Sequence, residues 1–185
     1  MQHVFRLTNG FVVPDETIVY PFLNSKDAKS EISWDVSDLT SLAVGLIAPF
    51  TSSKIHVHPI VTLITWVIQG QLTIKMKDKD NPIPYEVEIG PEQAALIAPH
   101  TFLQHINKTN MVCRVLYIVS PAYVYLPSAD ASQSYDDAIV LAQDWDTLAK
   151  ADWTLPELAD QTSLENARAT AITKLKEMRN SSNTV

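Results

Sequence analysis

The first two thirds of the chain carry hydrophobic and polar residues in patterns that are typical of β-strands. Residues 41–48 are almost entirely apolar, as expected of a strand buried on both faces. Residues 71–77 alternate instead: Leu72, Ile74 and Met76 share one face, and a threonine and two lysines share the other. We expect a half-exposed antiparallel strand here, with its lysines in solvent at the edge of a sheet.

Other short apolar runs lie between turn residues along the same part of the chain. We expect strands at 4–7, 11–13, 17–22, 54–58, 60–69, 85–89, 94–98, 102–107 and 111–119. Strands that recur roughly every ten residues indicate an all-β sandwich or barrel. Because no helical pattern interrupts residues 39–125, a fold of alternating strands and helices is disfavoured. The prediction is one antiparallel jelly-roll barrel over residues 41–125.

The pattern changes at residues 127–134, which are polar and are interpreted as a linker. Beyond them, apolar residues spaced as on a helix face predict helices over 135–150 and 162–179. Thr162 and Glu165 match the T-x-x-E capping box at the start of the second helix. We expect these helices to cover one face of the barrel, with a lid or a dimer arm as the alternative.

Composition and charge narrow the class of protein. The length of 185 residues fits a barrel with its N-terminal strands, 1–126, and a linker with a helical extension, 127–185. The formal net charge of −7 argues against nucleic acid as a partner, because phosphate binding needs clustered lysine and arginine. No apolar run approaches the roughly 20 residues of a membrane helix, so we expect no membrane partner.

The single cysteine and the N-terminal sequence bear on location. Cys113 is the only cysteine, so the chain cannot form an intrachain disulfide. It is expected to be a small core residue, since no activating partner is adjacent in the sequence. Residues 1–10 lack the charged start and apolar run of a signal peptide. We therefore expect a cytoplasmic protein.

Two histidines, His56 and His58, lie two positions apart in an apolar, β-branched run. Residues i and i+2 of a strand point to the same face, so both imidazoles would leave the sheet together. Neutral imidazole is the commonest metal ligand, which makes the pair a candidate metal site. The alternative is two histidines on a solvated strand face.

These residues resemble the cupin superfamily. Its first motif is G-x5-H-x-H-x3-4-E-x6-G, in which His56 and His58 match the histidines and Gly70 the last glycine. Its second motif, G-x5-P-x-G-x2-H-x3-N, is matched at Pro99. The resemblance covers about residues 41–120. It implies a double-stranded β-helix, a small jelly roll or cupin barrel, whose mouth holds one metal ion.

The chain departs from both motifs. The two positions allowed for the motif glutamate hold Thr62 and Leu63, and neither side chain is a carboxylate. In the second motif, strict counting places Gln104 where the histidine belongs and His105 one position later. A one-residue bulge before His105 would turn its imidazole inward. Without a bulge, Gln104 would point in and His105 out. Three motif glycines are replaced, by Phe50, Gln93 and Thr101.

On this resemblance the metal ligands would be His56, His58 and His105, with no acidic fourth ligand. Such a site suits Fe(II), with Zn(II) or Mn(II) as alternatives. Since no carboxylate is apparent nearby, the site is expected to be positive and to attract an anionic or enolisable substrate. The expected pocket residues are Leu63, Thr65, Gln104, Cys113 and Tyr117. Tyr123 and Tyr125 are expected to pack under the C-terminal tail rather than to reach the mouth.

The leading hypothesis is a metal-dependent cupin enzyme that acts on a small organic molecule, with a dioxygenase favoured over an isomerase or cyclase. The alternative is a non-catalytic cupin that binds a small hydrophobic ligand in the barrel without metal, as the missing glutamate and the displaced histidine suggest. A purely structural dimer is a third possibility. The expected partners are the small molecule and a second copy in a homodimer, with the apolar N-terminal strands as candidate edges.

Overall fold

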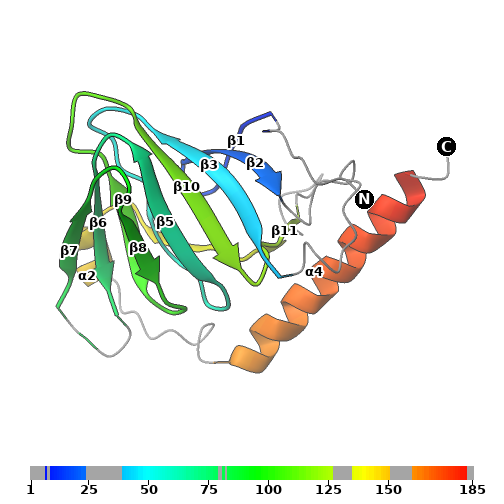
Figure 1. The fold of residues 1–185 in the computed structure, drawn as a ribbon. Helices are drawn as coiled ribbons and strands as arrows, with labels where there is room; N and C mark the ends of the chain where they lie inside the picture. Colours follow the sequence, from blue (N-terminus) through cyan, green and yellow to red (C-terminus); the bar gives the residue numbers. More distant parts are fainter. Residues whose placement is uncertain are drawn as a thin grey trace.

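Two antiparallel sheets form a barrel, and one long helix lies beside it (Figure 1). The computed structural model describes residues 7, 9–23, 39–78, 81, 83–126, 135–150 and 160–182. The strand expected at 4–7, except for residue 7, and the expected linker lie outside the described residues. Among the described residues, no helix has the length and apolar character needed to cross a membrane.

The first sheet has six strands in the order β1-β2-β3-β10-β5-β8. These strands are β1 (Phe11–Val12), β2 (Ile18–Leu23), β3 (Ser41–Ile47), β10 (Cys113–Ser120), β5 (Thr62–Gln69) and β8 (Ala94–Ile97). The second sheet has the order β13-β4-β9-β6-β7. Its strands are β13 (Ile139–Ala142), β4 (Ile55–Val57), β9 (Phe102–Ile106), β6 (Leu72–Lys77) and β7 (Tyr85–Ile89). Two short strands, β11 (Tyr125–Leu126) and β12 (Tyr135–Asp136), pair with each other.

Every strand pairing in the described residues is antiparallel, which confirms the predicted jelly-roll barrel. Successive side chains of a strand point to opposite faces of the sheet, so every second residue points into the barrel. In β5, Leu63, Thr65 and Val67 are buried inside, whereas Trp66 faces outward and is 40% exposed. Facing residues of β10, β6 and β9 complete one core between the sheets. Cys113 lies in this core, and burial raises the pKa of its thiol to about 11.

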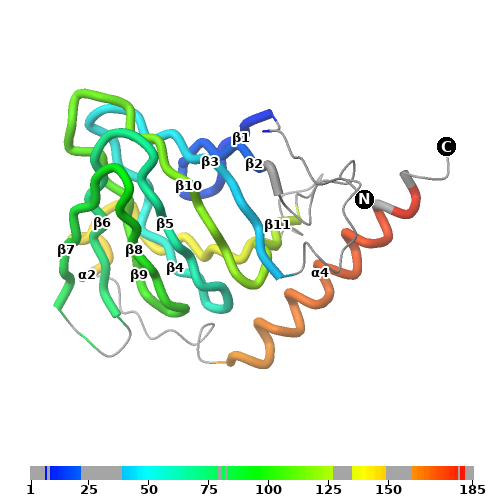
Figure 2. The backbone as a smooth tube through the Cα atoms, viewed as in Figure 1, coloured from blue at the N-terminus to red at the C-terminus, as the bar shows by residue number. Residues whose placement is uncertain are grey.

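The prediction of a helix over 135–150 is wrong for most of its length. Residues 135–142 instead form β12 and β13, and only α2 (Trp145–Lys150) is helical. In β13, Ile139 and Val140 pair with β4, which would otherwise be the edge of the five-stranded sheet. β-branched residues that can pair with an open edge gain more there than from a weak helical preference. Figure 2 shows this strand, in yellow, passing behind β5 and β10.

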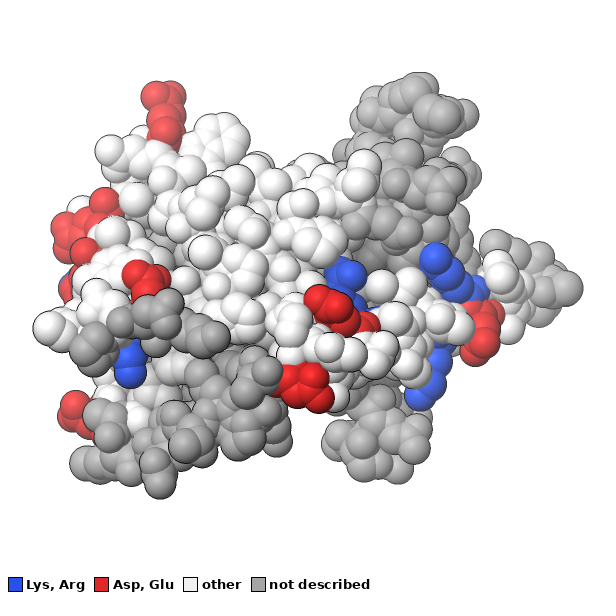
Figure 3. All heavy atoms as spheres, turned by 90° about the horizontal axis from the view of Figure 1, so that it is seen from below, with Lys and Arg blue, Asp and Glu red and all other residues white. Residues whose placement is uncertain are grey.

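The second predicted helix is confirmed as α4 (Gln161–Ser182), but its cap differs from the prediction. Thr162 lies inside the first turn, and Asp160 is the capping residue. Its Oδ1 accepts a hydrogen bond from the Ser163 backbone N–H at 3.2 Å. Charged side chains lie in solvent on the side of the molecule where α4 runs (Figure 3).

The lysines of β6 do not mark a sheet edge, as the sequence pattern suggested. β6 is an inner strand between β9 and β7. The Lys75 ammonium lies 5.3 Å from the ring centroid of Trp145, and Lys77 lies 5.9 Å from that of Phe102. The aliphatic stems thus lie over aromatic rings on the outer face of the five-stranded sheet, while the charged groups remain near solvent.

Candidate metal and ligand site in the barrel

Three buried histidines face the inside of the barrel from neighbouring strands. His56 and His58 belong to β4 and the residue after it, and His105 belongs to β9, the next strand in the sheet. The ring centroids of His56 and His58 are 5.1 Å apart, and those of His56 and His105 are 6.2 Å apart. The i, i+2 spacing therefore places both imidazoles of β4 on one face, as expected.

His105 faces inward without any bulge. β9 pairs with β6 in an unbroken register in which His105 is opposite Ile74, a fully buried core residue. Residues opposite each other in a sheet share a face, so His105 points to the core. The expectation that an unbulged strand would turn Gln104 inward is wrong, because motif counting across a turn does not determine the face of the strand that follows.

Gln104 lies on the opposite face of β9 and is not a pocket residue. Its Nε2 donates a hydrogen bond to the Ser53 carbonyl oxygen at 2.8 Å. Its Oε1 accepts one from the indole N–H of Trp145, also at 2.8 Å. The side chain thus joins β9 to α2 on the outside of the sheet, and its amide is used for packing rather than for a ligand.

His56 is oriented by groups on one edge of its ring. Its Nδ1 lies 3.0 Å from the Lys54 carbonyl oxygen and 3.4 Å from Oδ2 of Asp15. Both of these groups accept hydrogen bonds, so the neutral ring carries its proton on Nδ1 and has its lone pair on Nε2. The residue lines the cavity.

Asp15 was missed by sequence reasoning, and the expectation that no carboxylate lies near the histidines is wrong. The Asp15 side chain accepts hydrogen bonds from the Thr17 backbone N–H at 3.1 Å and from its hydroxyl at 3.0 Å. The Lys54 N–H donates to the Asp15 carbonyl oxygen at 2.9 Å. The sequence around Asp15 indicates an Asx-turn, but its contact with His56 depends on how the β1–β2 hairpin packs.

His58, like His56, has its Nδ1 close to a backbone carbonyl oxygen. Its Nδ1 lies 3.2 Å from the Asp137 carbonyl oxygen and so donates a hydrogen bond to it. Burial, with His56 nearby, lowers the pKa of His58 to about 3. Burial, with both other histidines nearby, lowers the pKa of His105 to about 3. His58 and His105 are therefore neutral at physiological pH, the form in which imidazole binds metals.

Two buried polar atoms near His105 have no hydrogen-bond partner among the described residues. Nε2 of His105 is 3.2 Å from the Thr65 hydroxyl, whereas its Nδ1 is unpaired. The Tyr117 hydroxyl is also unpaired, and the Tyr117 and His105 ring centroids are 5.5 Å apart. Burial and the Asp15 charge raise the pKa of Tyr117, so its hydroxyl remains a donor. Unpaired buried polar atoms in a cavity indicate a place for a ligand or water.

Gly45 explains how Tyr117 fits inside the barrel. The two residues lie on paired strands, β3 and β10, and a Cβ atom built on Gly45 would lie 2.4 Å from Cε2 of Tyr117. Two non-bonded carbon atoms cannot approach to that distance, so only glycine leaves room for the ring in this position. The close approach sets where the Tyr117 hydroxyl lies.

These residues line a cavity of about 100 Å³. Its walls are mostly apolar and come from β1, β2, β3, β5 and β10, with Phe11, Val19, Leu63 and Val119 among them. Of the expected pocket residues, Leu63 and Tyr117 line the cavity and Thr65 contacts His105 from behind, whereas Cys113 and Gln104 do not line it. The volume is below the roughly 150 Å³ of an enclosed apolar cavity that holds benzene.

Two tyrosines that follow the barrel also line this cavity. The ring centroid of Tyr123 lies 5.9 Å from that of His58, and Tyr125 stacks on Phe11 at 6.0 Å. The expectation that they pack under the tail, away from the mouth, is therefore wrong. The Tyr123 hydroxyl donates to Asp136, whose pKa burial raises to about 6.

The donor groups of the site are of the kind that bind divalent metals. Two histidines have Nδ1 bound to carbonyl oxygens, the arrangement that orients metal-ligating imidazoles, and the third has an unpaired buried nitrogen. The described residues contain no group of three His, Cys, Asp or Glu close enough to hold an ion as they stand. The ring centroids of His56 and His105 are 6.2 Å apart, which is wider than the roughly 5 Å of two imidazole rings on one tetrahedral ion.

No protein-family model and no curated protein matches this chain. Among solved structures, an oxalate decarboxylase from Lactobacillus farciminis in complex with formate gives a TM-score of 0.54 at 14% identity, covering 72% of this chain and 33% of that one. Drosophila melanogaster CENP-C bound to CAL1 gives 0.50 at 12% identity, covering 62% and 76%. CapF with the inhibitor 3-isopropenyl-tropolone gives 0.50 at 14% identity, covering 76% and 35%.

These similarities confirm the fold that the sequence motifs implied. The chain has the double-stranded β-helix fold of the cupins. It spans about a third of the length of the decarboxylase and of CapF. The fold is common to an enzyme and to a protein bound to another protein, so the function has to be argued from the site.

Proposed function

We propose that this protein is a metal-dependent cupin enzyme that acts on a small organic molecule in the barrel cavity. The observation that carries the proposal is the shared orientation of His56 and His58. Each has Nδ1 bound to a backbone carbonyl oxygen, which leaves Nε2 as a lone-pair donor to the same cavity. His105, with its unpaired nitrogen, would be the third ligand.

The metal we favour is Fe(II), with Zn(II) and Mn(II) as alternatives, because imidazole ligands and open positions suit these ions. When bound, such an ion would supply Lewis-acid or redox chemistry at a substrate oxygen. The chain's own groups would orient the substrate. The Tyr117 hydroxyl is a buried donor with no hydrogen-bond partner in the described part of the chain, and it could hold a carbonyl or hydroxyl oxygen beside the histidines.

The substrate we propose is compact and largely apolar, with one or two oxygen atoms. The volume of about 100 Å³ limits its size, and the apolar wall formed by residues such as Val19 and Val119 favours a hydrocarbon part. The Asp15 carboxylate, which lies next to His56, offsets positive charge in the site. We therefore do not propose an anionic substrate, which the sequence alone favours.

Two measurements test this function. The first measures the metal content of the untagged protein and its thermal unfolding before and after addition of Fe(II), Zn(II) or Mn(II). It tests whether the protein binds a divalent metal ion. A specific ion should stabilise the fold, by about 2.7 kcal/mol at 100 times its Kd. Oxygen uptake by the iron-loaded protein with a panel of small ketones and phenols then separates the favoured dioxygenase from an isomerase or cyclase, which consumes no oxygen.

A non-catalytic ligand-binding cupin is the second candidate, favoured by the apolar cavity and by the distance of His105 from His56. It predicts that no metal raises the unfolding temperature, whereas a small hydrophobic compound does. His100 provides a matched control for all histidine variants, since it lies in the turn before β9 and does not line the cavity. Asn is the suitable replacement there, because φ is +67° and Asn tolerates that conformation.

We also propose that the protein forms a homodimer through the outer face of the six-stranded sheet. Its outward side chains that are at least partly exposed include Ile18, Leu46, Ile64, Trp66, Ile68, Leu96, Leu116 and Ile118. Leu96 is 65% exposed and Trp66 40% exposed. Large contiguous apolar faces are unusual on monomers and often mark interaction sites.

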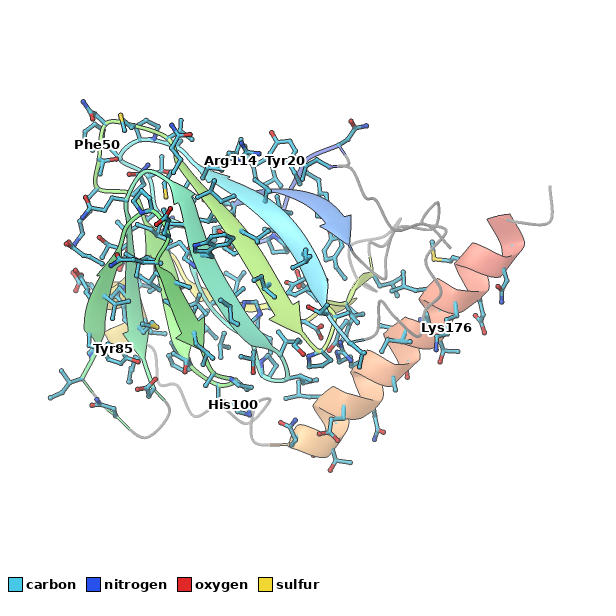
Figure 4. All side chains as sticks on the ribbon, in the orientation of Figure 1. Tyr20, Phe50, Tyr85, His100, Arg114 and Lys176 are labelled. Atoms are coloured by element: carbon cyan, nitrogen blue, oxygen red, sulfur yellow. The ribbon has the colours of Figure 1, made fainter. Side chains whose placement is uncertain are left out.

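Charge favours a second copy as the occupant of this face. Arg114 is the one charged side chain among the described outward residues of β3, β5, β8 and β10, and it lies near the end of the face where Tyr20 is found (Figure 4). In a chain with a net charge of −7, two copies meet with least repulsion where acidic groups are absent. Sedimentation of the Trp66→Lys variant should show a monomer where the unmodified protein shows a dimer. A monomer for the unmodified protein at micromolar concentration would contradict the proposal.

A further inference from the structure

Arg168 of the C-terminal helix α4 contacts the segment that holds His58. The guanidinium Nε lies 3.1 and 3.2 Å from the two carboxylate oxygens of Asp137, and a terminal N–H of Arg168 donates to the Ala122 carbonyl oxygen. The Arg168 side chain is 14% exposed, and that of Asp137 is fully buried. One turn further along α4, Ala171 packs against the residues around β11. The helix is thereby fixed with Arg168 over Asp137.

Asp137 is held from every side by polar groups. Its Oδ2 accepts the Val124 N–H at 2.7 Å, and its Oδ1 accepts the Tyr135 hydroxyl at 2.7 Å. Its backbone N–H donates to the Val124 carbonyl oxygen at 3.0 Å. The carboxylate has one cationic partner among these contacts, Arg168. A buried carboxylate that loses its cation is strongly destabilised, so Arg168 contributes to holding this segment beside the Val124 and Tyr135 contacts.

The remaining polar group of Asp137 faces the site. Its backbone carbonyl oxygen accepts the Nδ1–H of His58 at 3.2 Å. This bond keeps the proton on Nδ1 and the Nε2 lone pair toward the cavity. A continuous chain of contacts thus runs from the helix to the histidine through a single residue, with the carboxylate at one end and the carbonyl at the other.

We infer that Arg168 is a positioning residue of the candidate site: by holding Asp137, it fixes the ring and the tautomer of His58. The effect on metal binding rests on the proposed function, whereas the effect on the His58 ring is expected in the metal-free protein as well. The C-terminal helix is then part of the site rather than a cover on the barrel. Loosening α4 would release the imidazole that faces the cavity.

The test compares Arg168→Met, Arg168→Lys and a matched control, Lys174→Met. Lys174 lies on the same helix in solvent, so its variant removes the same charge without touching Asp137. The first readout is nitrogen NMR of the histidine rings in metal-free protein. In the unmodified protein and in the control, His58 should be the Nδ1–H tautomer. In Arg168→Met it should become a mixture of tautomers, and Arg168→Lys should lie between.

The second readout is Zn(II) affinity by titration calorimetry. Arg168→Met should weaken binding about tenfold, as is usual when a partner of a ligating histidine is lost. Unchanged His58 signals in a folded Arg168→Met protein would overturn the inference. If that variant does not fold, the Arg168→Lys spectrum decides, since signals equal to the unmodified protein's would overturn it. Should the unmodified protein bind no Zn(II), the proposed function fails, while the NMR result still decides the role of Arg168.

Discussion

Oδ2 of Asp15 lies 3.4 Å from Nδ1 of His56, although the two residues are 41 positions apart in the sequence. The contact joins the β1–β2 hairpin to the strand that carries two of the three histidines. A carboxylate beside the Nδ1–H of an imidazole raises the basicity of Nε2 and fixes the ring. The N-terminal strands therefore contribute to the candidate site, and not only to the barrel wall.

Changing Asp15 to Asn should weaken metal binding about 10–100-fold, because the amide removes the negative charge beside His56 but keeps a similar shape. Zn(II) titration calorimetry measures the effect. The matched control is Glu16→Gln, which removes a charge from the neighbouring residue, whose carboxylate pairs with Lys54 in solvent at 2.9 Å. Equal affinities for the Asp15 and Glu16 variants would show that Asp15 has no influence on the site.

Changing Gly45 to Ala should destabilise the fold by about 1–3 kcal/mol, because the new methyl group overlaps the Tyr117 ring in a packed core. Urea unfolding measures the free energy. Gly90→Ala is the control, since Oε1 of Gln93 would lie 3.8 Å from the added carbon, an ordinary van der Waals contact. If the two variants are equally stable, Tyr117 does not occupy the position over Gly45.

The Cys113 thiol should resist labelling in the native protein. Burial raises its pKa to about 11 from an ordinary value of 9.0, and only the thiolate reacts. Between pH 7 and pH 9 the native rate should stay low and rise about tenfold for each pH unit. The same chain in urea should react fast and approach its plateau near pH 9. Native labelling as rapid as in urea would contradict the burial of Cys113.

The sequence was sufficient for the barrel and for part of the site, for reasons that differ between residues. The spacing of His56 and His58 places them on one face whatever the fold, because strand geometry is local. The face of His105 depends on its register with Ile74, which spacing across a turn does not determine. Asp15 and Tyr123 join the site through contacts distant in sequence. Residues 139–142 pair with the edge of β4, and this pairing cannot be recognised from the local pattern of hydrophobic residues.

The homodimer and the metal remain the predictions with the widest consequences, and the metal is the central one. The test of metal binding is elemental analysis of untagged protein after metal loading and desalting. It compares the unmodified chain with His58→Ala, Gln104→Ala and His100→Asn. The account predicts about one equivalent of metal in the unmodified protein, in Gln104→Ala and in His100→Asn, and none in His58→Ala. An unmodified protein that retains no Fe(II), Zn(II) or Mn(II) under any loading condition would contradict it.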